Sequence, residues 1–230
     1  MCYILSVSAS KLEEIRCPCG EIFEAELWNA INASDDPELK EELLAGEINV
    51  VCCPVCGQLF YAEHFLLYQD SAAEILAFIY PSSFISQASH CMARMQEDFG
   101  RAMAELPEAS RISYEPILLF GLDTLVELIH EENEELDEVS ILQYAARKLH
   151  LSLIWLHPSL SRPLQIPRLL PIANKKNATL REQIIAGLSC LLEYNTHLSR
   201  YRKFLETVNR NKQWKLDKQL VKKKLNLKSH

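Results

Sequence analysis

Glycine is scarce in this 230-residue chain, which contains six glycines and three tryptophans. So few glycines leave few positions for backbone-lined anion sites, and the chain has no glycine-rich phosphate loop. It also lacks the HExxH pattern of zinc proteases and the GxSxG pattern of serine hydrolases. These absences predict a protein that is not an enzyme.

Long apolar runs are missing as well. No segment approaches the roughly 20 apolar residues that a membrane span needs, and the sequence does not begin with a charged and then apolar leader. We therefore expect a cytoplasmic protein that binds no membrane. The apolar fraction of 48% and the length are enough for one large domain or two small ones with a hydrophobic core.

The charges are unevenly spread along the chain, whose net charge is −7. Residues 131–138 form an acidic run, whereas almost all the charged residues of 200–228 are basic. In the basic segment Tyr201, Phe204 and Trp214 alternate with lysine and arginine, a pattern that allows phosphate contacts and base stacking. A protein is the partner we expect first, with nucleic acid as the alternative through this basic segment; the sequence does not indicate the oligomeric state.

Cysteine occurs eight times, and four cysteines form two similar turns. The first turn reads CPCG at residues 17–20, and the second reads CPVCG at residues 53–57. Zn²⁺ prefers four ligands in a tetrahedron. In such a turn the proline fixes the bend and the glycine tolerates positive φ, so the turn can direct two thiolates toward one point. The sequence therefore predicts a Zn²⁺ site. Its expected ligands are Cys17, Cys19, Cys53 and Cys56.

Other cysteines and one histidine lie near enough to these turns to be considered. The first turn is one residue shorter than the second, so Cys17 is the weakest candidate ligand and Cys52 could replace it. His64 follows the second turn, where a lone histidine is expected to be a hydrogen-bonded structural residue. The remaining cysteines are expected to be core or surface thiols, and they are Cys2, Cys91 and Cys190.

The residues around the turns predict a small β module with an inserted helix. Residues 21–27 alternate between charged and apolar side chains, and residues 58–63 are rich in strand formers. Phe23 and Phe60 lie at the same offset from the last cysteine of their turns. Between them, residues 36–46 predict a helix with Asp36 as N-cap and Gly46 as the C-terminal stop.

Beyond residue 72 the apolar spacing becomes helical, which predicts an α+β protein with a zinc-ribbon-like β module followed by a mostly α-helical region. We expect helices at 87–105, 117–130 and 139–150, a connector at 158–171, a long helix that a capping box opens at Thr179 and that runs to Leu198, and a basic amphipathic segment at 212–228. The corresponding segments are a zinc module at 1–81, its helical continuation at 82–157, and C-terminal helices with a basic tail at 172–230.

The chain resembles the bacterial and archaeal CpXC domain in the order of five short segments. These segments are CPCG, LWNAIN, DPELKEELLAGEIN, CPVCG and FLLYQD. The resemblance runs from Ile15 to Pro81 and more loosely to His157. It implies a zinc-binding protein of unassigned role, with Cys17, Cys19, Cys53 and Cys56 as the site. The chain differs from the family in its shortened first motif and in Gln69, where the family more often has histidine.

Two alternatives to a structural zinc in an interaction or regulatory module remain. The cysteine spacing is also similar to the switch of the redox-regulated heat-shock chaperone family, in which oxidation releases zinc; zinc-bound thiolates are nucleophilic and metal binding is coupled to folding. In that family the switch follows the chaperone domain, whereas here the cysteines come first. The other alternative is a nucleic-acid-binding zinc ribbon that uses the basic segment.

Overall fold

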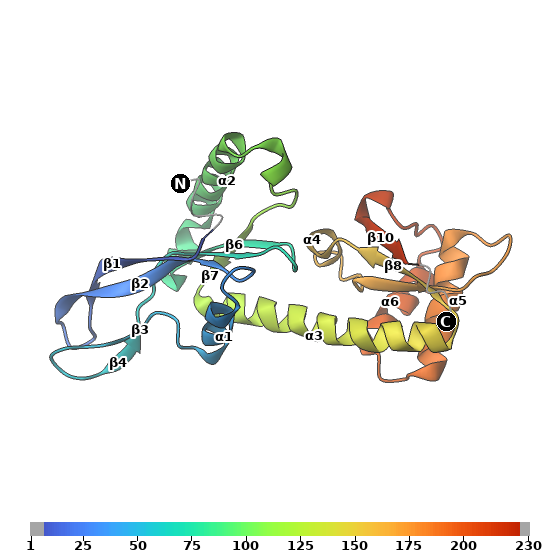
Figure 1. Ribbon diagram of the computed structural model, residues 1–230, viewed down its shortest axis with the longest axis horizontal. Helices are drawn as coiled ribbons and strands as arrows, with labels where there is room; N and C mark the ends of the chain where they lie inside the picture. Colours follow the sequence, from blue (N-terminus) through green and yellow to red (C-terminus); the bar gives the residue numbers. More distant parts are fainter. Residues whose placement is uncertain (1–6, 226–230) are drawn as a thin grey trace. The chain divides into compact units, whose positions relative to one another are not determined.

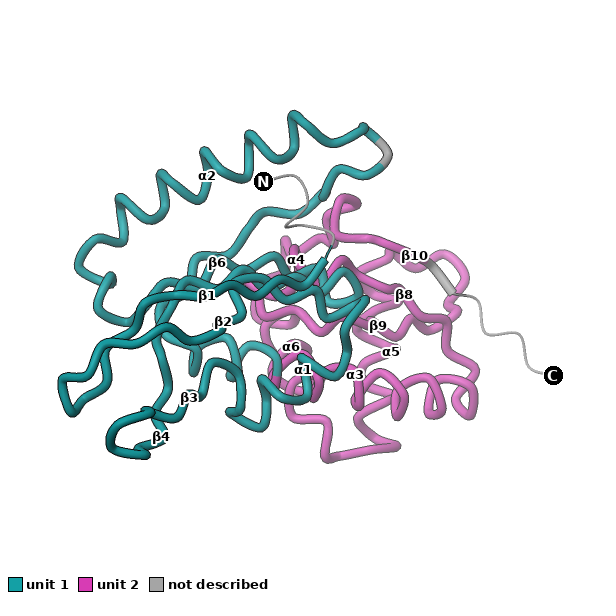
Figure 2. Tube along the Cα trace, turned by 60° about the vertical axis from the view of Figure 1, so that its left-hand side comes forward, with its two compact units in different colours: residues 1–129 teal, residues 130–230 magenta. Residues whose placement is uncertain are grey.

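The computed structural model describes residues 7–225. The chain divides into two compact units, unit 1 (residues 1–129) and unit 2 (residues 130–230) (Figure 2). Unit 1 is rich in strands and unit 2 is mainly helical, which confirms the α+β class (Figure 1). The boundary differs from the segments expected at 1–81 and 82–157, because a strand and two helices beyond residue 81 pack into unit 1. Helix α3 contributes residues to both units.

Unit 1 contains a five-stranded mixed sheet with the order β1-β2-β5-β6-β7. The pairs β1–β2 and β5–β6 are antiparallel, whereas β2–β5 and β6–β7 are parallel. A separate antiparallel hairpin consists of β3 and β4. The strands of unit 1 are β1 (Ala9–Arg16), β2 (Ile22–Asn32), β3 (Val50–Cys52), β4 (Leu59–Tyr61), β5 (Leu66–Asp70), β6 (Ile75–Tyr80) and β7 (Ile117–Phe120).

Helices cover both faces of this sheet because the side chains of its strands alternate between two apolar cores. Tyr68 and Ile79 face α1 (Pro37–Ala45) and the first turns of α3 (Leu122–Lys148). Leu67 and Phe78 face the opposite way, toward α2 (Ala88–Glu105). Short 3₁₀ turns at Ser82–Gln87 and Glu108–Ser110 flank α2.

The elements expected around the cysteine turns are present. Strand β2 begins in the segment 21–27 and extends beyond it, and β4 lies within the segment 58–63. Helix α1 is followed by Gly46, its C-cap, in the left-handed conformation with φ 75°. Asp36 is the N-cap of α1 as expected, but its side chain makes no capping hydrogen bond. The position of the helix was therefore predictable, although the side-chain cap was not.

The segment 117–130 is not a single helix, so that prediction was wrong. Residues 117–120 form β7, which pairs in parallel with β6, and a chain reversal at Gly121 with φ 80° separates it from α3. For the four apolar residues between Pro116 and Gly121, pairing with the buried strand β6 outweighs the helical spacing of the longer segment 117–130. Helix α3 then runs without a break through the acidic run, where two separate helices were expected.

Unit 2 contains a three-stranded antiparallel sheet with the order β10-β8-β9, packed against α3, α5 and α6. A capping box at Thr179 opens α5 as expected. In α5 Gly187 lies against β9 so closely that an added Cβ atom would be 2.4 Å from the Pro171 carbonyl oxygen. The elements of unit 2 are β8 (Ser152–Leu156), α4 (Pro158–Ser161), β9 (Leu169–Ile172), α5 (Leu180–Tyr194), α6 (Ser199–Arg210), a 3₁₀ turn (Lys218–Leu220) and β10 (Val221–Leu225).

Three expectations for unit 2 were wrong. The proline-rich segment 158–171 is not only a connector, because it contains α4 and most of β9. Leu198 is not part of the long helix, since α5 ends at Tyr194 and Leu198 is the N-cap of α6. The described part of the segment 212–228 ends in a 3₁₀ turn and a strand, β10, which pairs with β8 and follows the buried residue Leu220.

Candidate metal centre

The two cysteine turns lie at the tips of the β1–β2 and β3–β4 hairpins of unit 1 (Figure 1). In the first turn the Cys17 amide donates to the Glu21 carbonyl at 2.8 Å, and in the second the Cys53 amide donates to the Gln58 carbonyl at 2.9 Å. Each turn ends in a glycine with positive φ, 98° at Gly20 and 71° at Gly57. The shorter first turn thus closes in the same way as the second.

These tips bring the four expected ligands together. The four Sγ atoms all lie within 4.8 Å of one another, and the group consists of Cys17, Cys19, Cys53 and Cys56. Two contacts join one turn to the other: Sγ of Cys17 lies 3.7 Å from Sγ of Cys56, and Sγ of Cys19 lies 3.8 Å from Sγ of Cys53. Because zinc–sulfur bonds are about 2.3 Å long, two sulfurs of a tetrahedral zinc site are about 3.8 Å apart. The cluster therefore has the size of a tetrahedral thiolate site.

A small apolar cluster supports the site from the side of the strands. Cys17 and Cys53 are 2% and 1% exposed, whereas Cys19 and Cys56 are exposed. Beneath them the equivalent residues of the two turns, Phe23 and Phe60, meet edge to face with ring centroids 6.4 Å apart. This cluster has three buried residues, Leu27, Val51 and Ala62, so little apolar area holds the two hairpins together.

The four thiols do not share one pKa, because burial and nearby backbone amides act on them differently. Burial raises the pKa of the Cys17 thiol to about 12, whereas a hydrogen bond from the Cys56 amide lowers the pKa of Cys53 to about 7. The Gln58 amide acts to lower the pKa of Cys56, but the Cys53 thiol and burial together raise it. Four thiols held this close do not all ionise together near neutral pH, so a cation that binds them all would replace protons.

Cys52 does not belong to the cluster. Its exposed thiol points toward the backbone carbonyls of Cys53 and Gly57, at 3.9 and 3.6 Å. The structure therefore groups Cys17, rather than Cys52, with the other three sulfurs. His64 lies 3.4 Å from a carboxylate oxygen of Glu13 and outside the cluster.

The three remaining cysteines lie apart from the cluster or outside the described residues. Cys91 is buried in the core beneath α2, and Cys190 is partly buried on α5. Cys2 lies outside the described residues.

The aromatic residues of the basic segment differ in exposure. Tyr201 and Phe204 are 2% and 4% exposed in the core of unit 2. Trp214 packs edge to face on Phe204, with ring centroids 5.5 Å apart. Two of the three residues expected to stack on bases are therefore buried, whereas Trp214 is partly exposed.

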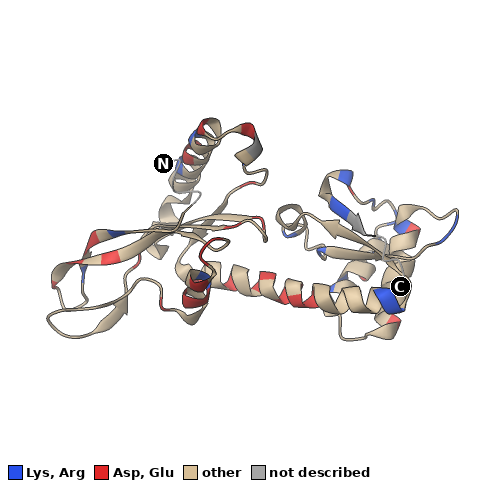
Figure 3. Cartoon of the chain, in the orientation of Figure 1, with Lys and Arg blue, Asp and Glu red and all other residues tan. Residues whose placement is uncertain are grey.

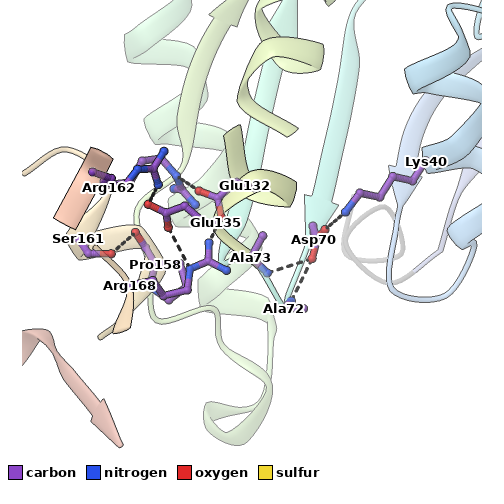
Figure 4. A network of polar contacts seen from close by, with 11 residues as sticks. Lys40, Asp70, Ala72, Ala73, Glu132, Glu135, Pro158, Ser161, Arg162 and Arg168 are labelled. Atoms are coloured by element: carbon purple, nitrogen blue, oxygen red, sulfur yellow. Dashed lines mark hydrogen bonds and ion pairs between the residues drawn. The ribbon is translucent and has the colours of Figure 1, made fainter. Parts of the chain in front are cut away.

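The acidic run lies along α3 and is partly neutralised within unit 2 (Figure 3). Glu132 is 4% exposed and contacts Arg162, at 2.7 Å, and Arg168. Glu135 contacts Arg168, at 3.3 Å, and Arg200 (Figure 4). These partners come mainly from the segment around α4. No spacing rule in the sequence links them, so this network could not have been predicted.

Comparison with known proteins agrees with the cysteine pattern. A family model described as CpXC protein matches residues 15–142, which cover more than half of the chain, including both cysteine turns. Searches of curated proteins and of solved structures each found no significant match. Among the described residues, no helix combines the length and the apolar content that crossing a membrane requires.

Proposed function

The chain belongs to the CpXC protein family, and from this premise we propose that it is a zinc-binding protein in which one structural Zn²⁺ shapes an interaction module. Its ligands are the thiolates of Cys17, Cys19, Cys53 and Cys56. The observation that carries the proposal is the spacing of the four sulfurs: all lie within 4.8 Å of one another, and the two contacts between the turns, of 3.7 and 3.8 Å, match the edge of a zinc–thiolate tetrahedron.

Thiolate ligands favour zinc over the harder cations. Carboxylates, carbonyls and water suit Mg²⁺ and Ca²⁺, whereas four sulfurs in a tetrahedron suit zinc or iron. Four protein ligands also leave no coordination position for a substrate or a water nucleophile. This donor set therefore supports a structural role for the ion, and we propose that the protein is not an enzyme.

The ion joins two hairpins that share little buried surface. Each hairpin supplies two ligands. Apart from these, a small apolar cluster and two hydrogen bonds between Trp28 of β2 and Asn49, just before β3, link the hairpins. Zinc binding then contributes directly to the free energy of folding of this region. The joined tips carry the exposed apolar side chains of Ile22, Val55 and Leu59, which are 45%, 68% and 68% exposed. Exposed apolar side chains on a rigid tip support a protein as the partner.

The exposure of Cys19 and Cys56 favours a redox switch as the second candidate. Peroxide would take two electrons from a pair of thiolates; a disulfide would form, two protons would be consumed and two waters would leave. Zinc would then lose two of its ligands. Stoichiometric zinc release at low peroxide concentration, reversed by thiol reductant, would support the switch over a purely structural ion.

Metal analysis of cysteine variants tests the proposal. The protein purified under reducing conditions without chelator should contain about one zinc per chain. Cys19→Ser and Cys56→Ser should each lose most of it, whereas Cys52→Ser, at an exposed neighbouring thiol, should retain it. The absence of zinc from the unaltered chain, or its loss from Cys52→Ser alone, would overturn the assignment.

A further inference from the structure

Strand β1 forms one edge of the five-stranded sheet. It pairs with β2 on one side, and among residues 7–225 it pairs with no strand on the other. An edge strand of this kind presents a row of backbone N–H and C=O groups that can pair with another strand. Its eight residues make it one of the longer strands in the protein.

The side chains of β1 form a self-complementary pattern around Leu12. The Leu12 side chain is 67% exposed. Its neighbours Lys11 and Glu13 carry opposite charges, lie on the same face of the strand and form an ion pair with each other. An antiparallel copy of this pattern would place unlike charges opposite one another.

We propose that β1 is a homodimer interface, in which the β1 strands of two copies pair antiparallel about a two-fold axis through Leu12. In this register each Lys11 lies opposite Glu13 of the partner subunit, so both charges gain a second neighbour of opposite sign. The two Leu12 side chains lie opposite each other, and Ala9 lies opposite Ile15 of the partner subunit. The two five-stranded sheets join into one continuous sheet.

Alternative registers are less favourable. A two-fold antiparallel pair requires facing residues on the same side of the sheet, so the axis must pass through one residue. An axis through Lys11, Glu13 or Glu14 would bring two like charges face to face, which destabilises a strand pair. An axis through Ile15 would pair only the last residues of the strand before the cysteine turn at Cys17. The axis through Leu12 engages the whole strand without such a clash.

Charged side chains commonly protect an edge strand from association, and Lys11 would do so against an unrelated strand. Against a second copy it instead meets Glu13, which makes the edge selective. The contact is a single strand pair, and interfaces of this small area are typical of weak dimers. We therefore expect a dimer that dissociates on dilution.

Charge-swap variants test the interface. Sedimentation velocity of the full chain over a concentration series should show a monomer–dimer equilibrium. Lys11→Glu puts a carboxylate opposite Glu13 of the partner subunit, and Glu13→Lys puts an ammonium group opposite Lys11 of the partner subunit; each should weaken association about tenfold or more. Mixing the two variants restores opposite charges at both contacts, so the mixture should form a heterodimer.

Two exposed positions serve as matched controls for charge. Lys176→Glu and Glu41→Lys change the net charge by the same amounts at exposed positions outside β1, and both variants should dimerise as the unaltered chain does. Unchanged zinc content and melting temperature would show that the β1 variants fold. A chain that stays monomeric at the highest concentration would overturn the proposal. So would a dimer that neither β1 variant weakens, or a mixture that fails to associate.

Discussion

The ion-pair network of unit 2 makes a demanding prediction, because it depends on a carboxylate that the sequence marks only as one of an acidic run. Glu132→Gln keeps the size of this side chain and removes its charge. The residue is 4% exposed, and its carboxylate contacts both Arg162 and Arg168. Its loss leaves the buried charge of Arg168, whose side chain is 3% exposed, with less compensation.

The magnitude follows from the burial and from the remaining partners. Removal of one member of a buried ion pair costs about 3–5 kcal/mol. Arg168 keeps its 3.3 Å contact with Glu135, and the Arg162 side chain is 18% exposed and can be hydrated, which favours the lower end. We expect Glu132→Gln to destabilise unit 2 by about 3 kcal/mol, a large part of the 5–15 kcal/mol typical of a domain.

Hydrogen exchange measured by mass spectrometry is the suitable assay because its peptides report on each unit separately. Peptides from β8, β9 and α5 should exchange faster in Glu132→Gln, whereas peptides from β5 and β6 should not change. Glu134→Gln, at an exposed position on the same helix, is the matched control and should stay within about 0.5 kcal/mol of the unaltered chain. An effect of Glu132→Gln as small as that of the control would refute the reasoning.

Two further predictions concern the tail and unit 1. A chain that ends at Arg210 loses β10 and the buried Leu220 side chain, so unit 2 should melt at a lower temperature or become insoluble, and an unchanged melting curve would contradict this. In unit 1, burial acts to raise the pKa of Asp70, but the Lys40 ammonium at 2.8 Å and two backbone amides outweigh it and hold the pKa below its ordinary value. This stabilisation should be complete above about pH 4 and be lost as the pH falls through the folded-state pKa, and Asp70→Asn should remove that part of the acid dependence in a pH series of urea unfolding curves.

Local chemistry explains what the sequence predicted well. The two cysteine turns, the stop of α1 at Gly46 and the capping box at Thr179 each depend on residues a few positions apart. Such features hold whatever the rest of the chain does. The meeting of the two turns was also predictable, because the repeated offset of Phe23 and Phe60 indicates two equivalent hairpins.

Elements that depend on distant partners were predicted poorly. The segment 117–130 has helical spacing, but its first four residues pair with β6 as β7, and β10 is a strand because it pairs with β8. The arginines that neutralise Glu132 and Glu135 come from segments about 30 or more residues away. In the sequence, Tyr201 and Phe204 resemble base-stacking residues. Their burial could not be predicted, because it depends on how α6 packs against the rest of unit 2.

X-ray absorption spectroscopy at the zinc edge tests the central claim most directly, since it counts the ligands and measures their distances. The four-cysteine site predicts four sulfur neighbours at about 2.3 Å and no nitrogen or oxygen ligand. Cys52→Ser should give the same spectrum, which would show that the fourth sulfur comes from Cys17. A first shell with nitrogen or oxygen ligands, or a protein that binds no zinc, would contradict the account.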